Sequence, residues 1–197
     1  VGGPSVTKTV AAGELHIDYA NFTGNDPKDT SQIKYLKSTN YGNTWSNEVK
    51  LSASVALNQG VSLAANGNTL LAVWRQYLFN TNQPDSLVYT VSTDRGNSWS
   101  KARTLGPSFI CPFDLTVSET QFRSEALPVA VSDGSKFYVF WAQRQGDCAT
   151  GQSRIAYLTS TNGNNWVNQP MVLDNSIGTA GHHYMPAAFA AGGVVQV

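Results

Sequence analysis

The 197-residue sequence predicts an all-β fold, a β-propeller of four-stranded antiparallel blades, and three observations lead to this prediction. Short runs in which apolar and polar residues alternate recur along the chain, as expected of strands with one buried face. The octapeptide STNYGNTW at 38–45 returns as STDRGNSW at 92–99 and, one residue shorter, as STNGNNW at 160–166. Equivalent residues lie about 54 to 68 positions apart, and four strands at such a period are typical of propeller blades.

Each predicted blade opens with a β-hairpin made of two strands, A and B. Residues 61–74 and 128–141 each contain two alternating runs that are joined at a glycine and end in a tryptophan. Alternation around a glycine turn is the pattern of a hairpin with one buried face. A weaker copy occupies 9–19, and 186–197 begins the same hairpin again.

A third strand, C, follows each hairpin, and the octapeptide then joins it to a closing strand, D. Strand C is predicted at 33–38, 87–92 and 154–160, and strand D at 48–52, 102–106 and 170–174. The predicted blades therefore span about 5–52, 59–106 and 126–174, and a fourth begins at about 184–197.

The octapeptide is predicted to hold the turn between strands C and D. The Asp or Asn at its third position can accept hydrogen bonds from loop amides two residues further on. Its glycine permits a positive φ, and its tryptophan is expected to fill the crevice beside its own sheet. The residues with this structural role are Ser38, Asn40, Gly42, Trp45, Ser92, Asp94, Gly96, Trp99, Ser160, Asn162, Gly163 and Trp166.

With its Ser-x-Asp-x-Gly-x-Ser-Trp pattern, the copy at 92–99 resembles the Asp-box, or bacterial neuraminidase repeat, of sialidase-like propellers. The resemblance extends over the whole chain, blade by blade. It implies a ring of six blades, of which this chain supplies about three and a half, so that the partners include the remaining blades of the same protein. The superfamily also contains other glycosidases, glycan-binding domains, sorting receptors and assembly factors, so the fold does not decide the function.

Composition excludes several classes of function. Thirteen basic residues balance thirteen acidic ones, which leaves no electrostatic footprint for nucleic acid or a membrane surface. No apolar run approaches the roughly 20 residues of a membrane span. Neither a glycine-rich phosphate loop nor an HExxH motif occurs, and we expect no cofactor and no metal. Charged residues make up 13% of the chain, about half the usual share of roughly 25%, which is typical of a secreted or cell-surface protein.

Strand order predicts which loops share a face of the disc. The octapeptide turns lie on one face with the A–B turns. The B–C loops and the D–A connections between blades lie on the other, which is called the crossover face below. The longest connection, 107–127, contains Cys111, and the B–C loop at 143–153 contains Cys148. We predict a disulfide between them, and two unpaired thiols are the alternative.

The resemblance to sialidases implies a candidate site on this crossover face. Sialidases place an arginine in a Phe/Tyr-Arg-Ile-Pro motif before a strand A, and a second arginine and an acid/base aspartate after strand B. Arg123, Arg144 and Asp147 follow this order, which implies that the two arginines bind the ligand and that Asp147 is catalytic. The motif departs from the family, because three extra residues precede Pro128 and it stands in the third predicted blade.

Further candidates for ligand binding are Arg75, which forms a similar pair with Asp85, and the neighbouring residues His183 and Tyr184. The tyrosine nucleophile of sialidases and its glutamate partner have no assignable counterpart in the sequence.

Two hypotheses from different classes remain. One is a secreted sialidase-like glycoside hydrolase, for example of the exo-sialidase type. The other is a non-catalytic Asp-box propeller that binds a glycan or a protein. A structural repeat module of a larger surface protein is a third. The expected ligand is a glycan or glycoprotein, and a Tyr–Glu pair on the crossover face would favour the enzyme.

Overall fold

The computed structural model describes residues 11–24, 30–52, 56–77, 85–106, 110–117, 122–173 and 181–197. These residues form fifteen strands and contain no helix, which confirms the predicted all-β class. In particular, no helix of the described part is long and apolar enough to cross a membrane. The first arm of the weak hairpin predicted at 9–19 falls mainly outside the described residues.

The strands pair in chain order, and every pairing is antiparallel. The first blade contains β1 (Leu15–Phe22), β2 (Ser31–Ser38) and β3 (Val49–Lys50). The second contains β4 (Leu57–Asn66), β5 (Thr69–Tyr77), β6 (Ser86–Ser92) and β7 (Arg103–Thr104). The third contains β10 (Val129–Ser132), β11 (Phe137–Arg144), β12 (Ser153–Ser160) and β13 (Met171–Val172). Two hairpins complete the described strands: β8 (Leu115–Val117) with β9 (Phe122–Ser124), and β14 (Phe189–Ala191) with β15 (Val194–Gln196).

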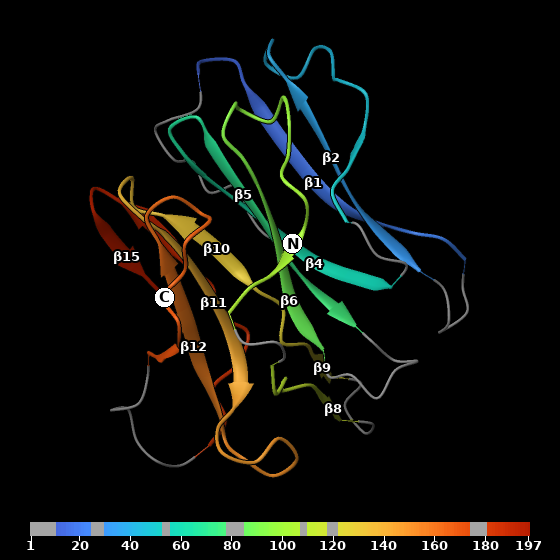
Figure 1. Cartoon of the computed structure of the whole chain (residues 1–197). Helices are drawn as coiled ribbons and strands as arrows, with labels where there is room; N and C mark the ends of the chain where they lie inside the picture. The colour runs from blue at the N-terminus through green and yellow to red at the C-terminus, as the bar shows by residue number, and fades with distance from the viewer. Residues whose placement is uncertain are drawn as a thin grey trace.

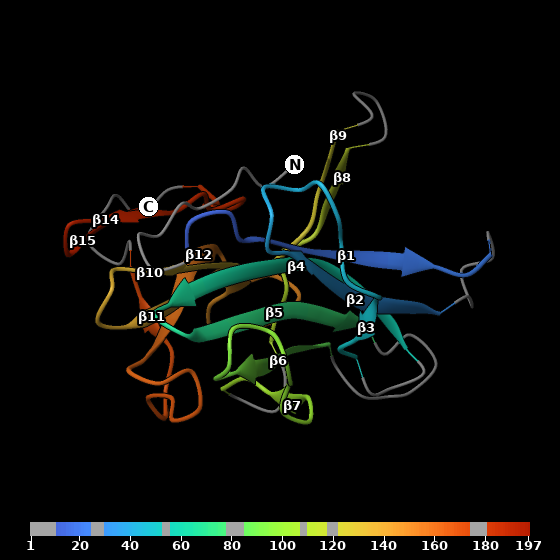
Figure 2. The same ribbon diagram turned by 90° about the horizontal axis from the view of Figure 1, so that it is seen from above.

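The sheets stand side by side as successive blades (Figure 1), and the view from above shows them packed face to face (Figure 2). Three apolar clusters lie between them: one joins the first blade to the second, one the second to the third, and one the third to the β14–β15 hairpin. The four-stranded antiparallel sheets are those predicted for propeller blades, and the octapeptide turns lie at the opposite end of the blades from the β8–β9 hairpin (Figure 1).

Strand register defines equivalent positions in the three blades. Leu15, Leu70 and Phe137 each lie opposite the first serine of their own octapeptide. From there, alternate residues of β1, β5 and β11 face the preceding blade, and the residues between them face the next one. Leu70 and Phe137 are fully buried in this way, whereas Leu15, at the outer face of the first blade, is 44% exposed.

Hydrogen bonds inside the octapeptide turns explain why these residue types recur. Ser92 Oγ donates to Asp94 Oδ1 at 2.7 Å and accepts from the amide of Gly96 at 2.7 Å. Asp94 Oδ1 accepts from the amide of Ser98, four residues on, rather than from the predicted amide two residues on. Ser98 Oγ donates a further hydrogen bond, to Asp94 Oδ2. Together with the bonds from the Ser98 amide and from Ser92 Oγ, it lowers the pKa of Asp94 to about 2. The shorter third copy keeps the predicted contact, from the amide of Asn164 to Asn162.

The octapeptide tryptophans of the second and third blades each contact the blade before their own. Trp99 meets Tyr35 of β2 edge to face, with 4.8 Å between the ring centroids. Trp166 meets Tyr89 of β6 in the same way at 5.6 Å. The predicted crevice beside the tryptophan's own sheet is therefore the boundary between two blades, a position that sequence periodicity within one blade does not reveal.

The octapeptide glycine has a second role besides its conformation. Gly96 has a φ of +78°, and a Cβ atom there would lie 1.9 Å from Tyr35 Oη. Gly67, in the A–B turn, also has a positive φ, +61°, but a Cβ atom there would meet no atom within 4 Å. Substitutions at these two glycines therefore distinguish the cost of backbone strain from the cost of a steric clash with Tyr35.

We predict that Gly67→Ala lowers the free energy of unfolding by about 1 kcal/mol, the cost of the left-handed conformation. Gly96→Ala should cost about 3 kcal/mol or more, because Tyr35 must also move away from Trp99. Urea denaturation of both variants measures the difference. Equal losses of unfolding free energy in the two variants would show that the packing of Tyr35 does not depend on a glycine at position 96.

Asp18 occupies a position that is apolar in the other blades. It lies opposite Tyr35, as Val73 lies opposite Tyr89 and Phe140 opposite Tyr157. Its Oδ2 atom is buried without a hydrogen-bond partner, and burial raises its pKa from 3.8 to about 7.

Asp18→Asn should stabilise the chain at pH 8 and have little effect at pH 4. The unfolded carboxyl ionises near pH 3.8 and the folded one near pH 7, so between these values the folded state holds more protons. Stability attributable to this group therefore falls as pH rises through that window and stays low above it. Melting temperatures of both proteins from pH 3.5 to 8.5 measure the effect; parallel profiles would contradict the assignment.

Candidate functional site

The segment Ile110–Asp114 joins the second and third blades on the crossover face. The amide of Ile110 donates to the carbonyl of Asp85 at 2.9 Å, at the start of the second blade's strand C. Cys111 accepts from the amide of Arg144 at 2.8 Å, and Pro112 forms an isolated β-bridge with Gln143. This part of the long connection is thus held by backbone contacts to both blades, and the β8–β9 hairpin extends beyond it (Figure 2).

A disulfide fixes the same segment to the third blade. Cys111 and Cys148 are bonded, with 5.0 Å between their Cα atoms, which confirms the predicted pairing. Because the two cysteines are the only ones in the sequence, neither thiol is free.

Phe113 is the centre of an aromatic and cationic cluster. Its ring is buried and stacks on His182, with 4.5 Å between centroids and 19° between the planes. The guanidinium carbon of Arg144 lies 4.9 Å from its centroid, and Tyr184 lies 5.5 Å away. The connection into the third blade therefore also contacts the connection that leaves it.

Arg144 is the last residue of β11 and Asp147 lies in the B–C loop that follows, and each has contacts with that loop. Arg144 Nη1 donates to the carbonyl of Gly151 at 2.8 Å. The exposed carboxylate of Asp147 accepts from the amides of Ala149 and Thr150 and from Thr150 Oγ1, at 2.7 to 2.9 Å. These bonds, the Thr150 hydroxyl first, lower the pKa of Asp147, the opposite of the shift that suits a general acid near neutral pH.

Arg75 lies between two carboxylates at the end of β5. Its Nε and Nη2 donate to Asp85 Oδ2 at 3.0 and 2.6 Å, and its Nη1 and Nη2 donate to the two oxygens of Asp114 at 2.6 Å. The arginine is 1% exposed, whereas the Asp114 side chain is 41% exposed. Burial opposes the charge, yet the two carboxylates raise the pKa of Arg75, so the buried cation is fully paired.

A tyrosine–glutamate pair lies beside this ion pair. Tyr77 Oη donates to Glu125 Oε2 at 2.9 Å, and the guanidinium carbon of Arg75 stands 4.1 Å from the Tyr77 centroid. Tyr77 is 5% exposed, and its pKa is raised, by burial first. Arg75, Tyr77, Asp85, Asp114 and Glu125 are called the Arg75 cluster below. Asp114 directly follows Phe113, so the Arg75 cluster and the Phe113 cluster share one segment of chain.

The remaining predicted site residues are placed as follows. Arg123 lies in β9, where its backbone pairs with Thr116 of β8. The amide of His183 donates to the carbonyl of Ser153, and Tyr184 is 37% exposed. Among the described residues, no group of three His, Cys, Asp or Glu side chains could hold a metal ion.

Sequence reasoning missed Tyr77, Phe113, Asp114 and Glu125. Tyr77 follows Arg75 at the spacing that puts two side chains on the same face of a strand, which was an available signal. Asp114 and Glu125 stand in an insertion without a repeat equivalent, so nothing in the periodicity pointed to their meeting with β5.

Neither a protein family nor a curated protein sequence matches the chain. Among solved structures, the α-L-arabinanase of Penicillium chrysogenum, complexed with arabinobiose, is similar with a TM-score of 0.56 and 16% identity, over 95% of this chain and 53% of the arabinanase. A Trypanosoma rangeli sialidase in complex with 2,3-difluorosialic acid has a TM-score of 0.48 and 19% identity, over 79% and 28%. A mutant of the NanB sialidase of Streptococcus pneumoniae has a TM-score of 0.46 and 14% identity, over 87% of this chain and 22% of the sialidase.

The likeness to the arabinanase shows the fold alone, a β-propeller. This chain spans between about a fifth and about half of the length of these three proteins.

We predict that the double variant Cys111→Ser, Cys148→Ser loses about 4 kcal/mol of unfolding free energy, the loop-closure value for a separation of 37 residues. Urea denaturation without reductant measures this loss. Reduced wild-type protein should unfold at the same urea concentration as the double variant. Two titratable thiols in the unfolded, unreduced protein would contradict the disulfide.

Proposed function

We propose that this chain forms the glycan-binding part of a secreted propeller of the glycoside-hydrolase type, and that the glycan binds on the crossover face. The observation that carries the proposal is the Arg75 cluster, in which side chains from β5 and from two connections converge on that face. Asp114 reaches the surface there, and carboxylates accept hydrogen bonds from sugar hydroxyl groups. The octapeptide turns, in contrast, resemble one another, and their side chains form hydrogen bonds within the same turn, as the bonds from Ser98 to Asp94 illustrate.

The contacts of Arg75 favour an uncharged sugar over an acidic one at the Arg75 cluster. A substrate carboxylate is bound best by a guanidinium group with free donors. Arg75 is already paired with two carboxylates. The disulfide supports the secreted location, because such bonds persist in oxidising compartments.

Sialidase-type hydrolysis is the second candidate, and the Tyr77–Glu125 pair is the observation that favours it. Sialidases use a tyrosine nucleophile, and a glutamate that accepts the phenol proton would activate it. Asp147 would be the acid/base by the resemblance stated above, although its turn contacts favour the ionised form. Hydrolysis of 4-nitrophenyl glycosides that stops in Tyr77→Phe while binding persists would support this candidate.

The glycan proposal is tested by calorimetric titration with arabinobiose, lactose and 3′-sialyllactose. We expect binding of at least one neutral sugar and no gain from sialylation. Glu125→Gln should weaken that binding by about tenfold or more, the scale of one charge-assisted hydrogen bond. Asp133→Asn is the control, since it also removes a carboxylate charge that accepts hydrogen bonds, from Ser135 and Lys136, but Asp133 lies in the A–B turn of the opposite face.

Tighter binding of 3′-sialyllactose than of lactose, lost in Arg123→Ala, would instead support an acidic glycan that is bound by Arg123. Equal losses in Glu125→Gln and Asp133→Asn, or binding of none of the three sugars, would contradict the proposed site.

A further inference from the structure

The backbone around His182 is fixed to the start of β12 in the third blade. The amide of His183 donates to the carbonyl of Ser153 at 3.0 Å, and Ser153 Oγ donates to the carbonyl of His183 at 2.8 Å. On the other side of His182, the carbonyl of Gly181 accepts from Arg154 Nη1 at 2.9 Å. These three contacts position the backbone of His182 without using its side chain.

The imidazole ring of His182 is held by contacts of its own. It stacks on the buried ring of Phe113, and its Nδ1 atom accepts a hydrogen bond from the amide of Ser153 at 3.1 Å. Because a backbone amide can only donate, Nδ1 carries no proton, and the neutral ring has its proton on Nε2. The orientation and the tautomer of the ring are therefore both set by the protein.

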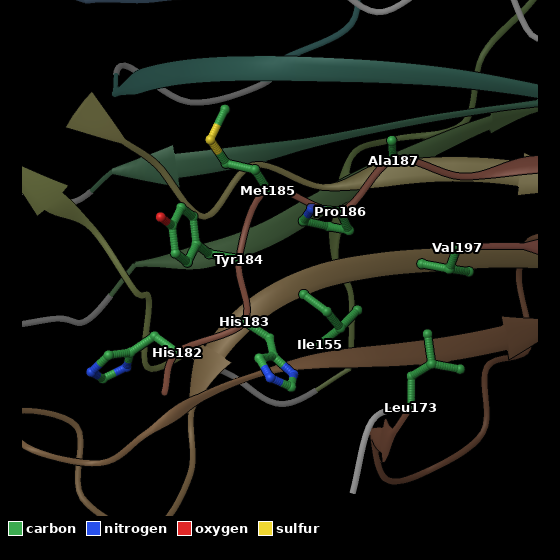
Figure 3. Close-up of a pocket in the computed structure, with 9 residues that line it drawn as sticks. All are labelled: Ile155, Leu173, His182, His183, Tyr184, Met185, Pro186, Ala187 and Val197. Atoms are coloured by element: carbon green, nitrogen blue, oxygen red, sulfur yellow. The ribbon is translucent and has the colours of Figure 1, made fainter. Parts of the chain in front are cut away.

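His182 and Tyr184 present their rings on the same side of this segment. Figure 3 shows both rings on one side and the ring of His183 on the other, near Ile155. His182 and Tyr184 are exposed, and the Tyr184 ring lies 5.5 Å from that of Phe113. Within the part of the chain that the structure describes, no acceptor meets His182 Nε2. The two residues thus offer aromatic surface and one unused donor.

This surface adjoins the carboxylate of Asp114 on the crossover face. Phe113, against which both rings lie, directly precedes Asp114, so their Cα atoms are about 3.8 Å apart. The carboxylate of Asp114 only accepts hydrogen bonds, whereas His182 Nε2 only donates. Sugar hydroxyl groups both donate and accept, so a single glycan can satisfy the two groups.

The chemistry of His182 suits an uncharged ligand. A neutral imidazole lacks the positive charge that strengthens a hydrogen bond to a carboxylate, so its N–H matches a hydroxyl oxygen. Its ring is already ordered by Phe113 and Ser153, and a side chain that is ordered in advance loses little freedom on binding. Aromatic surface with a few well-placed polar groups is also the usual lining of a small-molecule site.

We propose that His182 and Tyr184 form a second sugar subsite beside the Arg75 cluster, so that the crossover face binds a neutral glycan of at least two sugar units. One unit is bound at Asp114 and Glu125. The next lies on Tyr184, with a hydroxyl oxygen that accepts from His182 Nε2. The inference rests on the glycan proposal and extends it, because it specifies the minimum length of the ligand and the residues at its second unit.

Calorimetric titration of the 197-residue chain with arabinose, arabinobiose, galactose and lactose tests this subsite. The chain should bind at least one disaccharide more tightly than the monosaccharide that the disaccharide contains. His182→Phe keeps an aromatic ring on Phe113 but has no ring donor. It should weaken binding of that disaccharide by about fivefold or more, the scale of one lost hydrogen bond, and leave the monosaccharide affinity unchanged.

His183→Ala is the matched control, since His183 contacts Ser153 through backbone atoms that the substitution keeps. It should change neither affinity. A loss of the same size in His183→Ala, or a disaccharide affinity that His182→Phe does not alter, would overturn the subsite.

Glu125→Gln distinguishes failure of the subsite from failure of the glycan proposal. Disaccharide binding that is weakened in Glu125→Gln but not in His182→Phe would overturn the subsite alone, whereas binding of none of the four sugars would overturn both. In ¹⁵N-labelled chain, His182 Nε2 should carry the ring proton, and its resonance should shift when the disaccharide is added. A ring proton on Nδ1, or a resonance that the disaccharide does not move, would contradict the proposed contact.

Discussion

The second and third blades are each attached to the blade before them through an edge-to-face contact between an octapeptide tryptophan and a strand C tyrosine. The contact depends on the turn, because the internal bonds of Ser92 and Asp94 fix where Trp99 points. It also depends on a glycine, since Tyr35 occupies the space that a side chain at position 96 would take. Serine, aspartate or asparagine, glycine and tryptophan thus recur together because one interface needs all four, and a change in any of them acts on two blades.

The octapeptide turns have this structural role on one face, and the loops of the crossover face vary in length. The longest connection lies on the crossover face, and its segment Ile110–Asp114 joins two blades through a disulfide, a β-bridge and the stacking of Phe113. Function concentrates in variable loops that a rigid scaffold supports. Here the loops are themselves supported, because Cys111, Phe113 and Asp114 fix them to β5 and β11, and the Arg75 cluster is held in place from both sides.

The sequence predicted the blades well because periodicity is local information. Alternation located the strand pairs, and the repeated octapeptide located the C–D turns within one or two residues. The pairing of Cys111 with Cys148 followed from topology alone. What could not be predicted depends on contacts between segments without a common period: Trp99 on the neighbouring blade, and Asp114 and Glu125 on β5. Arg75 was selected as a ligand candidate, but its two carboxylate partners become visible only in three dimensions.

Departures from the repeat show where the chain does something besides fold. Ala20, Arg75 and Ala142 are equivalent by register, and so are Asp18, Val73 and Phe140. A charge in such a position loses its hydration and is tolerated when partners replace the water. Arg75 has those partners in two carboxylates and a tyrosine, which themselves come from connections that vary between blades. Asp18 Oδ2 has none. The same substitution of an apolar repeat position by a charge has therefore given a fully paired cluster at one blade boundary and a carboxyl oxygen without a hydrogen-bond partner at the other.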